Sequence, residues 1–228
     1  MDVAGVKSLA LAAALSLAAT QDLPHAFPRD GARQVLDNPW ATAWEATWAP
    51  HVQTPLHRHA FDYVGVELVD STFNVTPPGG TPRQTSRKKG DAYFLPKGTA
   101  HSEEGLSDQP PRHAVLIDLK PQHSPTVANN TRYRTVFPEG VAKKVVDNAR
   151  VVMWDLTWTA GQPAQTYFYT HNTFIVYVDG GELRSSEAGG VEALRQIAPG
   201  QVAFVAAGRS RSDQATSAPV RAILVELK

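Results

Sequence analysis

Two histidines, His57 and His59, stand one residue apart in the strand-like stretch "PLHRHAFDYVGVEL". Residues two apart on a strand point to the same face, about 6.6 Å apart. Imidazoles inside an apolar barrel need hydrogen-bond partners or a shared metal ion, because an unpaired buried polar group is costly. A third histidine, His101, follows the turn at residues 96–98. If the strands that carry them are neighbours, three imidazole nitrogens converge, and the pattern predicts a metal site.

The composition limits which metal and which partners are possible. The chain has 228 residues and no cysteine, so disulfides, thiolate metal sites and cysteine nucleophiles are excluded. Three neutral imidazoles with room for water suit one divalent transition metal, which could be Fe, Mn, Cu, Ni or Zn. The 22 basic and 22 acidic residues cancel, which gives no electrostatic reason to expect nucleic acid as a partner. We therefore expect a small-molecule substrate or ligand.

An internal repeat divides the chain into two units. The segment "WEATW" at residues 44–48 returns as "WDLTW" at 154–158, and "GDAYFLPKG" at 90–98 returns as "GQVAFVAAG" at 200–208, both shifted by 110 residues. Repeats in the same order at one offset indicate a tandem duplication. We predict an N-terminal barrel over residues 21–120, a linker over 121–150 and a C-terminal barrel over 151–228.

Both units have the sequence character of β-structure. Stretches such as "YVGVELV", "TFIVYV" and "RAILVEL" are short, rich in β-branched and aromatic residues, and bounded by Gly, Pro, Asp or Ser. No long segment after the N-terminus has a 3.6-residue period. Many short strands at regular spacing predict an all-β fold made of sandwiches or barrels. A homodimer through edge strands stays open.

The N-terminus predicts export. Lys7 precedes the apolar run "SLALAAALSLAA", and small residues lead to Thr20. A run of about a dozen apolar residues is typical of a signal peptide and shorter than the roughly 20 residues of a membrane span. We predict a signal peptide over residues 1–20 and a periplasmic or extracellular protein with no membrane span after its removal.

The histidine pattern, H-x-H and then G-x5-P-x-G-x2-H from Gly90 to His101, resembles the two motifs of the cupin superfamily. The histidines fall on that family's metal-ligand positions, and Gly90, Pro96 and Gly98 fall on its turn positions. The resemblance implies a bicupin with two tandem double-stranded β-helix (jelly-roll) barrels. It also implies a metal held by His57, His59 and His101.

One departure from the family pattern concerns the fourth ligand. Cupins usually place a Glu a few residues after H-x-H, where this chain has Tyr63 and Val64. Three readings stay open: no fourth protein ligand, Asp62 brought round by a bulge, or Tyr63 through its phenol. A three-His site resembles the thiol and diketone dioxygenase branches, and Tyr63 and Glu103 are then the candidates for proton or hydrogen-bond roles. The alternative is a non-catalytic ligand- or metal-binding protein with a vestigial site.

The second unit lacks the histidines. The 110-residue offset maps His57, His59 and His101 to Tyr167, Tyr169 and Arg211. These residues form either a polar-ligand pocket or an internal hydrogen-bond network, and the network is the preferred interpretation. For the N-terminal barrel we expect a partly aromatic pocket lined by Phe61, Tyr63, Val66, Phe94, Val115 and Ile117.

Overall fold

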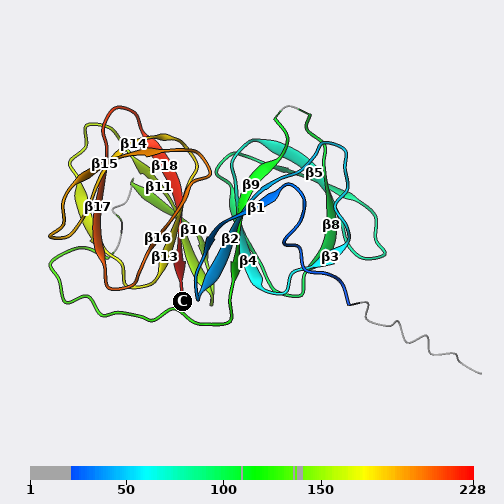
Figure 1. Ribbon diagram of the computed structural model, residues 1–228, viewed down its shortest axis with the longest axis horizontal. Coiled ribbons are helices and arrows are strands. Elements are labelled where there is room, and N and C mark those ends of the chain that lie inside the picture. The colour runs from blue at the N-terminus through cyan, green and yellow to red at the C-terminus, as the bar shows by residue number, and fades with distance from the viewer. Residues whose placement is uncertain (1–21, 109, 136, 138–140) are drawn as a thin grey trace, which may run out of the picture.

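The computed structural model describes residues 22–108, 110–135, 137 and 141–228, and within these residues the protein is entirely β (Figure 1). Eighteen strands form two five-stranded and two four-stranded sheets, and no helix occurs among the described residues. Two barrels lie side by side, joined by an extended segment along one edge of the molecule. The predicted all-β, jelly-roll fold class is confirmed.

The N-terminal barrel pairs a five-stranded sheet, in the order β1-β2-β9-β4-β7, with a four-stranded sheet, in the order β3-β8-β5-β6. All of its strand pairs are antiparallel. Its strands are β1 (Ala32–Asp37), β2 (Ala41–Thr47), β3 (His57–Arg58), β4 (Asp62–Glu67), β5 (Ser71–Thr76), β6 (Arg83–Arg87), β7 (Ala92–Leu95), β8 (Ala100–Gly105) and β9 (His113–Leu119).

The C-terminal barrel repeats this topology, with sheets in the orders β10-β11-β18-β13-β16 and β12-β17-β14-β15. The register irregularity of the β1–β2 pair, between Gln34 and Leu36, recurs in the β10–β11 pair. The predicted linker, residues 121–150, therefore contains the first strand of the second barrel. The strands are β10 (Ala142–Asp147), β11 (Val151–Trp158), β12 (Gln165–Phe168), β13 (Thr173–Tyr177), β14 (Gly181–Glu187), β15 (Ala193–Ile197), β16 (Val202–Val205), β17 (Ser210–Ala215) and β18 (Val220–Leu227).

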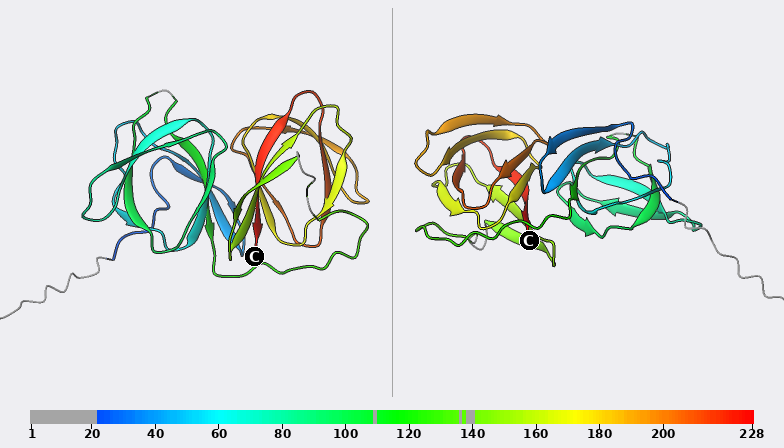
Figure 2. Two further views of the ribbon diagram at one scale, coloured as in Figure 1. Left: turned by 180° about the vertical axis from the view of Figure 1, so that it is seen from behind. Right: turned by 60° about the horizontal axis from the view of Figure 1, so that its bottom comes forward.

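The two five-stranded sheets pack against each other and form a shared apolar core between the barrels (Figure 2). Val66, Val115 and Ile117 belong to this core, together with Phe174 and Val225 of the second barrel. Phe94 packs against the same cluster. The prediction that Val66, Phe94, Val115 and Ile117 line the N-terminal barrel is therefore wrong, because these side chains point toward the other barrel.

Strand β4 is buried on both faces, which explains its nearly continuous apolar sequence. Val64 and Val66 contact the second barrel, whereas the alternate residues Tyr63 and Glu67 face the interior of the first barrel. Between them, Gly65 leaves room for the Tyr93 ring, which a side chain at that position would overlap. The interior of the first barrel thus holds polar and aromatic groups, while the core of the contact between the barrels is apolar.

The segment before β1 closes part of the first barrel. Phe27 is buried and stacks on Trp44, with ring centroids 5.2 Å apart. The predicted signal peptide, residues 1–20, lies outside the described residues. Within the part of the chain that the structure describes, no helix has the length and hydropathy to cross a membrane.

Candidate metal centre

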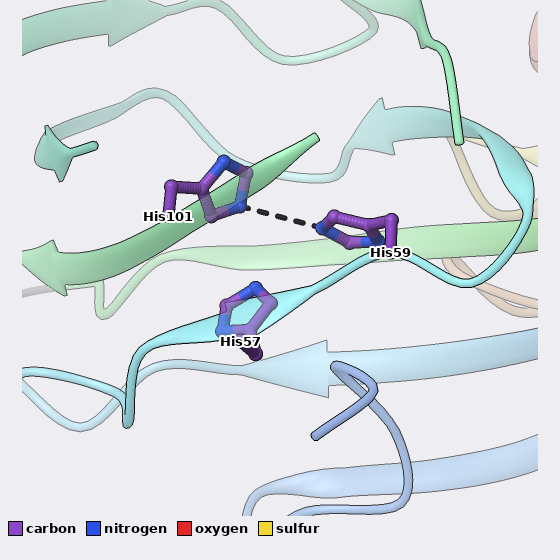
Figure 3. A group of neighbouring side chains, drawn as sticks. All are labelled: His57, His59 and His101. Atoms are coloured by element: carbon purple, nitrogen blue, oxygen red, sulfur yellow. Dashed lines mark hydrogen bonds between the residues drawn. The ribbon is translucent and has the colours of Figure 1, made fainter. Parts of the chain in front are cut away.

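Two antiparallel strands bring the three histidines together, as Figure 3 shows. His57 of β3 is directly opposite His101 of β8. The pairing continues past β3, because the His59 amide donates to Thr99 O at 2.9 Å and the Gly98 amide donates to His59 O at 2.8 Å. Gly98 has a φ of 86°, a left-handed conformation that favours glycine. This turn sets the register that places His101 beside His57 and His59.

The geometry of the cluster fits one metal ion. One ring nitrogen from each histidine lies within 4.8 Å of the others, and all three residues are buried. The Nε2 atoms of His59 and His101 are 3.4 Å apart. Two nitrogens bound to one tetrahedral Zn²⁺ at about 2.1 Å would be separated by about 3.4 Å. The closest nitrogen pair therefore already has the spacing of two ligands on one ion.

The protonation state of the cluster also suits metal binding, which needs neutral imidazoles. Burial lowers the pKa of His57, His59 and His101, and it holds the pKa of His59 at about 3. The Nδ1–H group of His57 donates to the carbonyl of Pro55 at 2.9 Å, which leaves the His57 Nε2 lone pair free. A backbone acceptor of this kind orients a ligating histidine and fixes its tautomer.

The metal-free protein is expected to lose stability as the pH falls from 7 to 5. Unfolded His59 takes up a proton near pH 6.5, whereas folded His59 stays neutral to about pH 3. The unfolded state therefore binds more protons in this interval, and the His59 contribution to the loss is about 2 kcal/mol. Urea unfolding with a chelator at both pH values measures it. His59→Gln should lose about 2 kcal/mol less than the wild type; equal losses would contradict the prediction.

The structure places Asp62 outside the cluster. Asp62 Oδ1 accepts a hydrogen bond from the Lys97 amide at 2.9 Å, and Oδ2 lies 3.1 Å from Nε of Arg150 in the second barrel. No bulge turns Asp62 inward, since β4 runs in unbroken register with β9 from residue 62 to residue 67. This arrangement corrects the reading of Asp62 as a fourth ligand, because both carboxylate oxygens have other partners.

Asp62→Asn is expected to leave the metal content unchanged. The substitution weakens the partly exposed ion pair with Arg150, so the free energy of unfolding should fall by about 1 kcal/mol or less. Elemental analysis and urea unfolding measure the two quantities. Loss of metal in this variant, with the fold retained, would restore Asp62 as a ligand.

The two candidate catalytic residues, Tyr63 and Glu103, lie beside the cluster. The Tyr63 ring stacks on His59, with centroids 4.0 Å apart and planes at 24°, and burial raises the pKa of its phenol. Glu103 is buried two residues after His101, accepts hydrogen bonds from Arg112 and Trp48, and has its pKa lowered to about 2, with Arg112 opposing the effect of burial. Glu103 is therefore a fixed anion, and Tyr63 supports the ring of His59 through stacking.

Arg112 organises the interior next to the cluster, and the sequence analysis did not identify it. Its guanidinium donates to Glu103 Oε1 at 2.8 Å and to Glu67 Oε1 at 2.9 Å. Arg112 is 1% exposed, and its guanidinium carbon lies 4.0 Å from the Trp48 ring centroid and 3.6 Å from that of Phe73. One buried cation thus joins two buried carboxylates, and this network sets the polar side of the barrel interior.

A cavity of about 380 Å³ opens beside the histidines. His101, Tyr63, Glu103 and Arg112 contribute to its wall. The remaining lining residues come mainly from the four-stranded sheet and β7: Phe73, Val75, Pro77, Arg83, Thr85, Arg87, Tyr93, Leu95, Thr99 and Ala100. A small organic molecule in this cavity would lie against His101 of the three-histidine cluster.

The second barrel has a hydrogen-bond network where the first has histidines. Tyr167 is opposite Arg211, in the same pairing as His57 and His101. The Arg211 guanidinium donates to Asp213 at 2.9 Å and to the Tyr177 hydroxyl at 3.3 Å. This contact neutralises the charge of Arg211, so the interpretation as an internal network fits the structure better than that of an anion pocket.

Comparisons with known proteins support the fold. No protein-family model matches the chain. The beta-alanine degradation protein BauB of Pseudomonas aeruginosa is 37% identical over 67 residues, which cover 29% of this chain and 70% of that protein. A cupin 2 conserved barrel domain protein from Leptotrichia buccalis has a TM-score of 0.55 at 15% identity, over 86% of this chain and 88% of that one.

A second solved structure has a similar fold over both barrels. The salicylate 1,2-dioxygenase of Pseudaminobacter salicylatoxidans has a TM-score of 0.60 at 15% identity, over 86% of this chain and 76% of that one. The chain belongs to the same family as BauB, and the solved structures show that it has the cupin fold.

Proposed function

We propose that the protein binds one divalent transition metal through His57, His59 and His101 and is a metal-dependent enzyme acting on a small organic substrate. The observation that carries the proposal is the convergence of three neutral imidazoles, one of which, that of His101, lines a cavity of about 380 Å³. Three protein ligands leave further coordination positions for water or substrate, which is the arrangement of catalytic rather than structural metal sites.

The roles of the chain's own residues follow from their contacts. The three histidines hold the ion, Pro55 orients His57, and Tyr63 supports the ring of His59. The cavity wall binds the substrate and excludes water. A redox-active ion supplies oxygen chemistry here, whereas Zn²⁺ supplies Lewis-acid chemistry. The similar folds include both a salicylate dioxygenase and an oxalate decarboxylase, so the identity of the metal has to decide the reaction.

Elemental analysis of protein purified without a metal-chelating tag tests the site. We expect about one transition metal ion per chain in the wild type, and none in the His57→Ala/His59→Ala/His101→Ala variant. The identity of the ion then chooses between oxygen and Lewis-acid chemistry. No metal in the wild type, even after incubation with each candidate ion, would refute the proposal.

The response to a small anion separates an enzyme from a storage or structural site. Co²⁺-loaded protein should change its visible absorption on addition of azide, because three histidines leave exchangeable positions on the ion. Asp62→Asn serves as the matched control and should respond like the wild type. An unchanged spectrum would indicate a closed site and favour the non-catalytic alternative.

We also propose that the protein is exported to the periplasm or the extracellular space. The support is the sequence of residues 1–20, in which Lys7 precedes an apolar run too short to span a bilayer. Mass spectrometry of the mature protein from its native host should give a mass that lacks about the first 20 residues. An intact N-terminus on cytoplasmic protein would refute export.

A further inference from the structure

Strand β6 carries two arginines, the exposed Arg83 and the partly buried Arg87, that line the same cavity as His101. Arg83, Thr85 and Arg87 alternate along β6 and all line the cavity that includes His101. Arg83 is opposite Val75 on β5, and Val75 is opposite Glu103 on β8, two residues from His101. Strand spacings place the Arg83 and His101 Cα atoms roughly 12 Å apart. A small molecule can therefore contact both the Arg83 guanidinium and the metal site.

The donors of these two arginines remain available. Arg87 Nε is buried and has no hydrogen-bond partner within the described residues, and its nearest carboxylate oxygen, on Glu67, is 3.9 Å away. Among the same residues Arg83 has no ion-pair partner. The nearby carboxylates, Glu67 and Glu103, are both bound by Arg112 at hydrogen-bond distance. Three arginines face two carboxylates, so this side of the cavity has a net charge of +1 before any metal is counted.

The rest of the cavity wall is apolar or aromatic. Phe73, Val75 and Leu95 line it, together with the rings of Tyr63 and Tyr93. The Arg87 guanidinium lies over the Tyr93 ring, with its central carbon 3.7 Å from the ring centroid, and this cation–π contact holds the guanidinium in place. The cavity therefore combines two cationic side chains at one side, Arg87 held against Tyr93 and the exposed Arg83, with a largely apolar body, and this matches an organic anion better than a neutral or cationic molecule.

The duplicated barrel provides an internal comparison. Ser185 pairs with Ala193 and Gly181 pairs with Ile197 on β14 and β15, which are the registers that Val75–Arg83 and Ser71–Arg87 occupy on β5 and β6. The second barrel therefore lacks both arginines as well as all three histidines. The cationic pair is present only in the barrel that has the metal cluster.

We propose that Arg83 and Arg87 form a carboxylate-binding site, so that the substrate is a small carboxylic acid with an apolar or aromatic body. The guanidinium groups bind the carboxylate, and the body packs on Phe73 and Leu95 with its other end toward the histidines. The proposal deepens the function proposed above and rests on it for the reaction. The binding step does not require the metal, because the arginines are separate from the histidines.

Calorimetry with matched probes tests the site. Isobutyrate, benzoate and phenylacetate are titrated into the full chain, each beside its neutral amide, in metal-loaded and metal-free protein. At least one acid should bind about tenfold more tightly than its amide, because hydrogen bonds to charged groups are strong. Arg83→Gln/Arg87→Gln should abolish this preference while the metal content stays that of the wild type. Arg83→Gln alone, on the exposed edge strand, gives a second variant if the pair folds poorly.

Arg195→Gln is the matched control, since Arg195 lies on the corresponding strand β15 and also lines a cavity. It should keep the preference for the acid. The proposal is overturned if no acid binds more tightly than its amide, if the double variant keeps the preference, or if only Arg195→Gln loses it. A wild type without metal refutes the proposed function alone, because the acid–amide comparison is also made on metal-free protein.

Discussion

Arg112→Met is expected to lower the free energy of unfolding by about 3–5 kcal/mol, the cost of breaking a buried ion pair from one side. The substitution removes the only cation that hydrogen-bonds both Glu67 and Glu103 within the described structure. Glu67 is 0% exposed, so its carboxylate cannot regain water after the change. Arg87 lies 3.9 Å from Glu67 and is too distant to replace a direct hydrogen bond.

Urea unfolding of the wild type and the variant measures this cost, and a second variant identifies its cause. Arg112→Met combined with Glu67→Gln and Glu103→Gln should recover part of the loss, because no uncompensated charge remains buried. Arg150→Met is the matched control, since it breaks a partly exposed ion pair and a hydrogen bond to the Lys120 carbonyl and should cost about 2 kcal/mol or less. A similar cost for Arg112→Met and Arg150→Met would show that the buried network contributes little to stability.

The fold and the metal cluster could be predicted from the sequence because each depends on local patterns. Strand periodicity places His57 and His59 on one face, and the glycine turn at Gly98 sets the register of His101. The internal repeat is visible as sequence identity, and the structure reproduces it down to the irregularity shared by the β1–β2 and β10–β11 pairs.

The inner wall of the cavity could not be predicted, because strands β4 and β9 are buried on both faces. In a strand with one solvated face, apolar side chains identify the core; here Val66, Val115 and Ile117 contact the second barrel instead. The polar residues of the same strands mark the true interior, as Glu67 does. Glu67 lies two residues after Gly65 and four after Tyr63, so all three residues share one face of β4. This spacing could have identified the face that lines the barrel interior.

Arg112 and the arginines of β6 were missed for a related reason. Isolated arginines among polar residues usually lie in solvent, and the sequence around Arg83 and Arg87 has no apolar alternation to place them in a barrel. Their inward position follows from the pairing of β6 with β5, which is a non-local property. The contacts of Asp62 could not be predicted for the same reason, because its partner Arg150 lies in the other barrel.

Metal binding is expected to stabilise the protein by about 4 kcal/mol when the free ion is at a thousand times its dissociation constant. The three histidines supply the only cluster of three or more candidate ligands among the described residues, so the His57→Ala/His59→Ala/His101→Ala variant should show no such effect. Thermal and urea unfolding with Zn²⁺ or with a chelator measure the difference. Equal stabilisation of wild type and variant would place the ion elsewhere.

The proton balance of metal binding distinguishes this buried site from an exposed histidine cluster. Three exposed histidines with a pKa of 6.5 would be half protonated at pH 6.5 and would release about 1.5 protons on binding an ion. Burial lowers the pKa of all three ligands here, so fewer protons should be released at that pH than an exposed cluster would release. Calorimetry at pH 6.5 in buffers of different ionisation enthalpy measures this number. Release of about 1.5 protons would mean that the imidazoles are solvated in the metal-free protein, and the cluster would then have to form on metal binding.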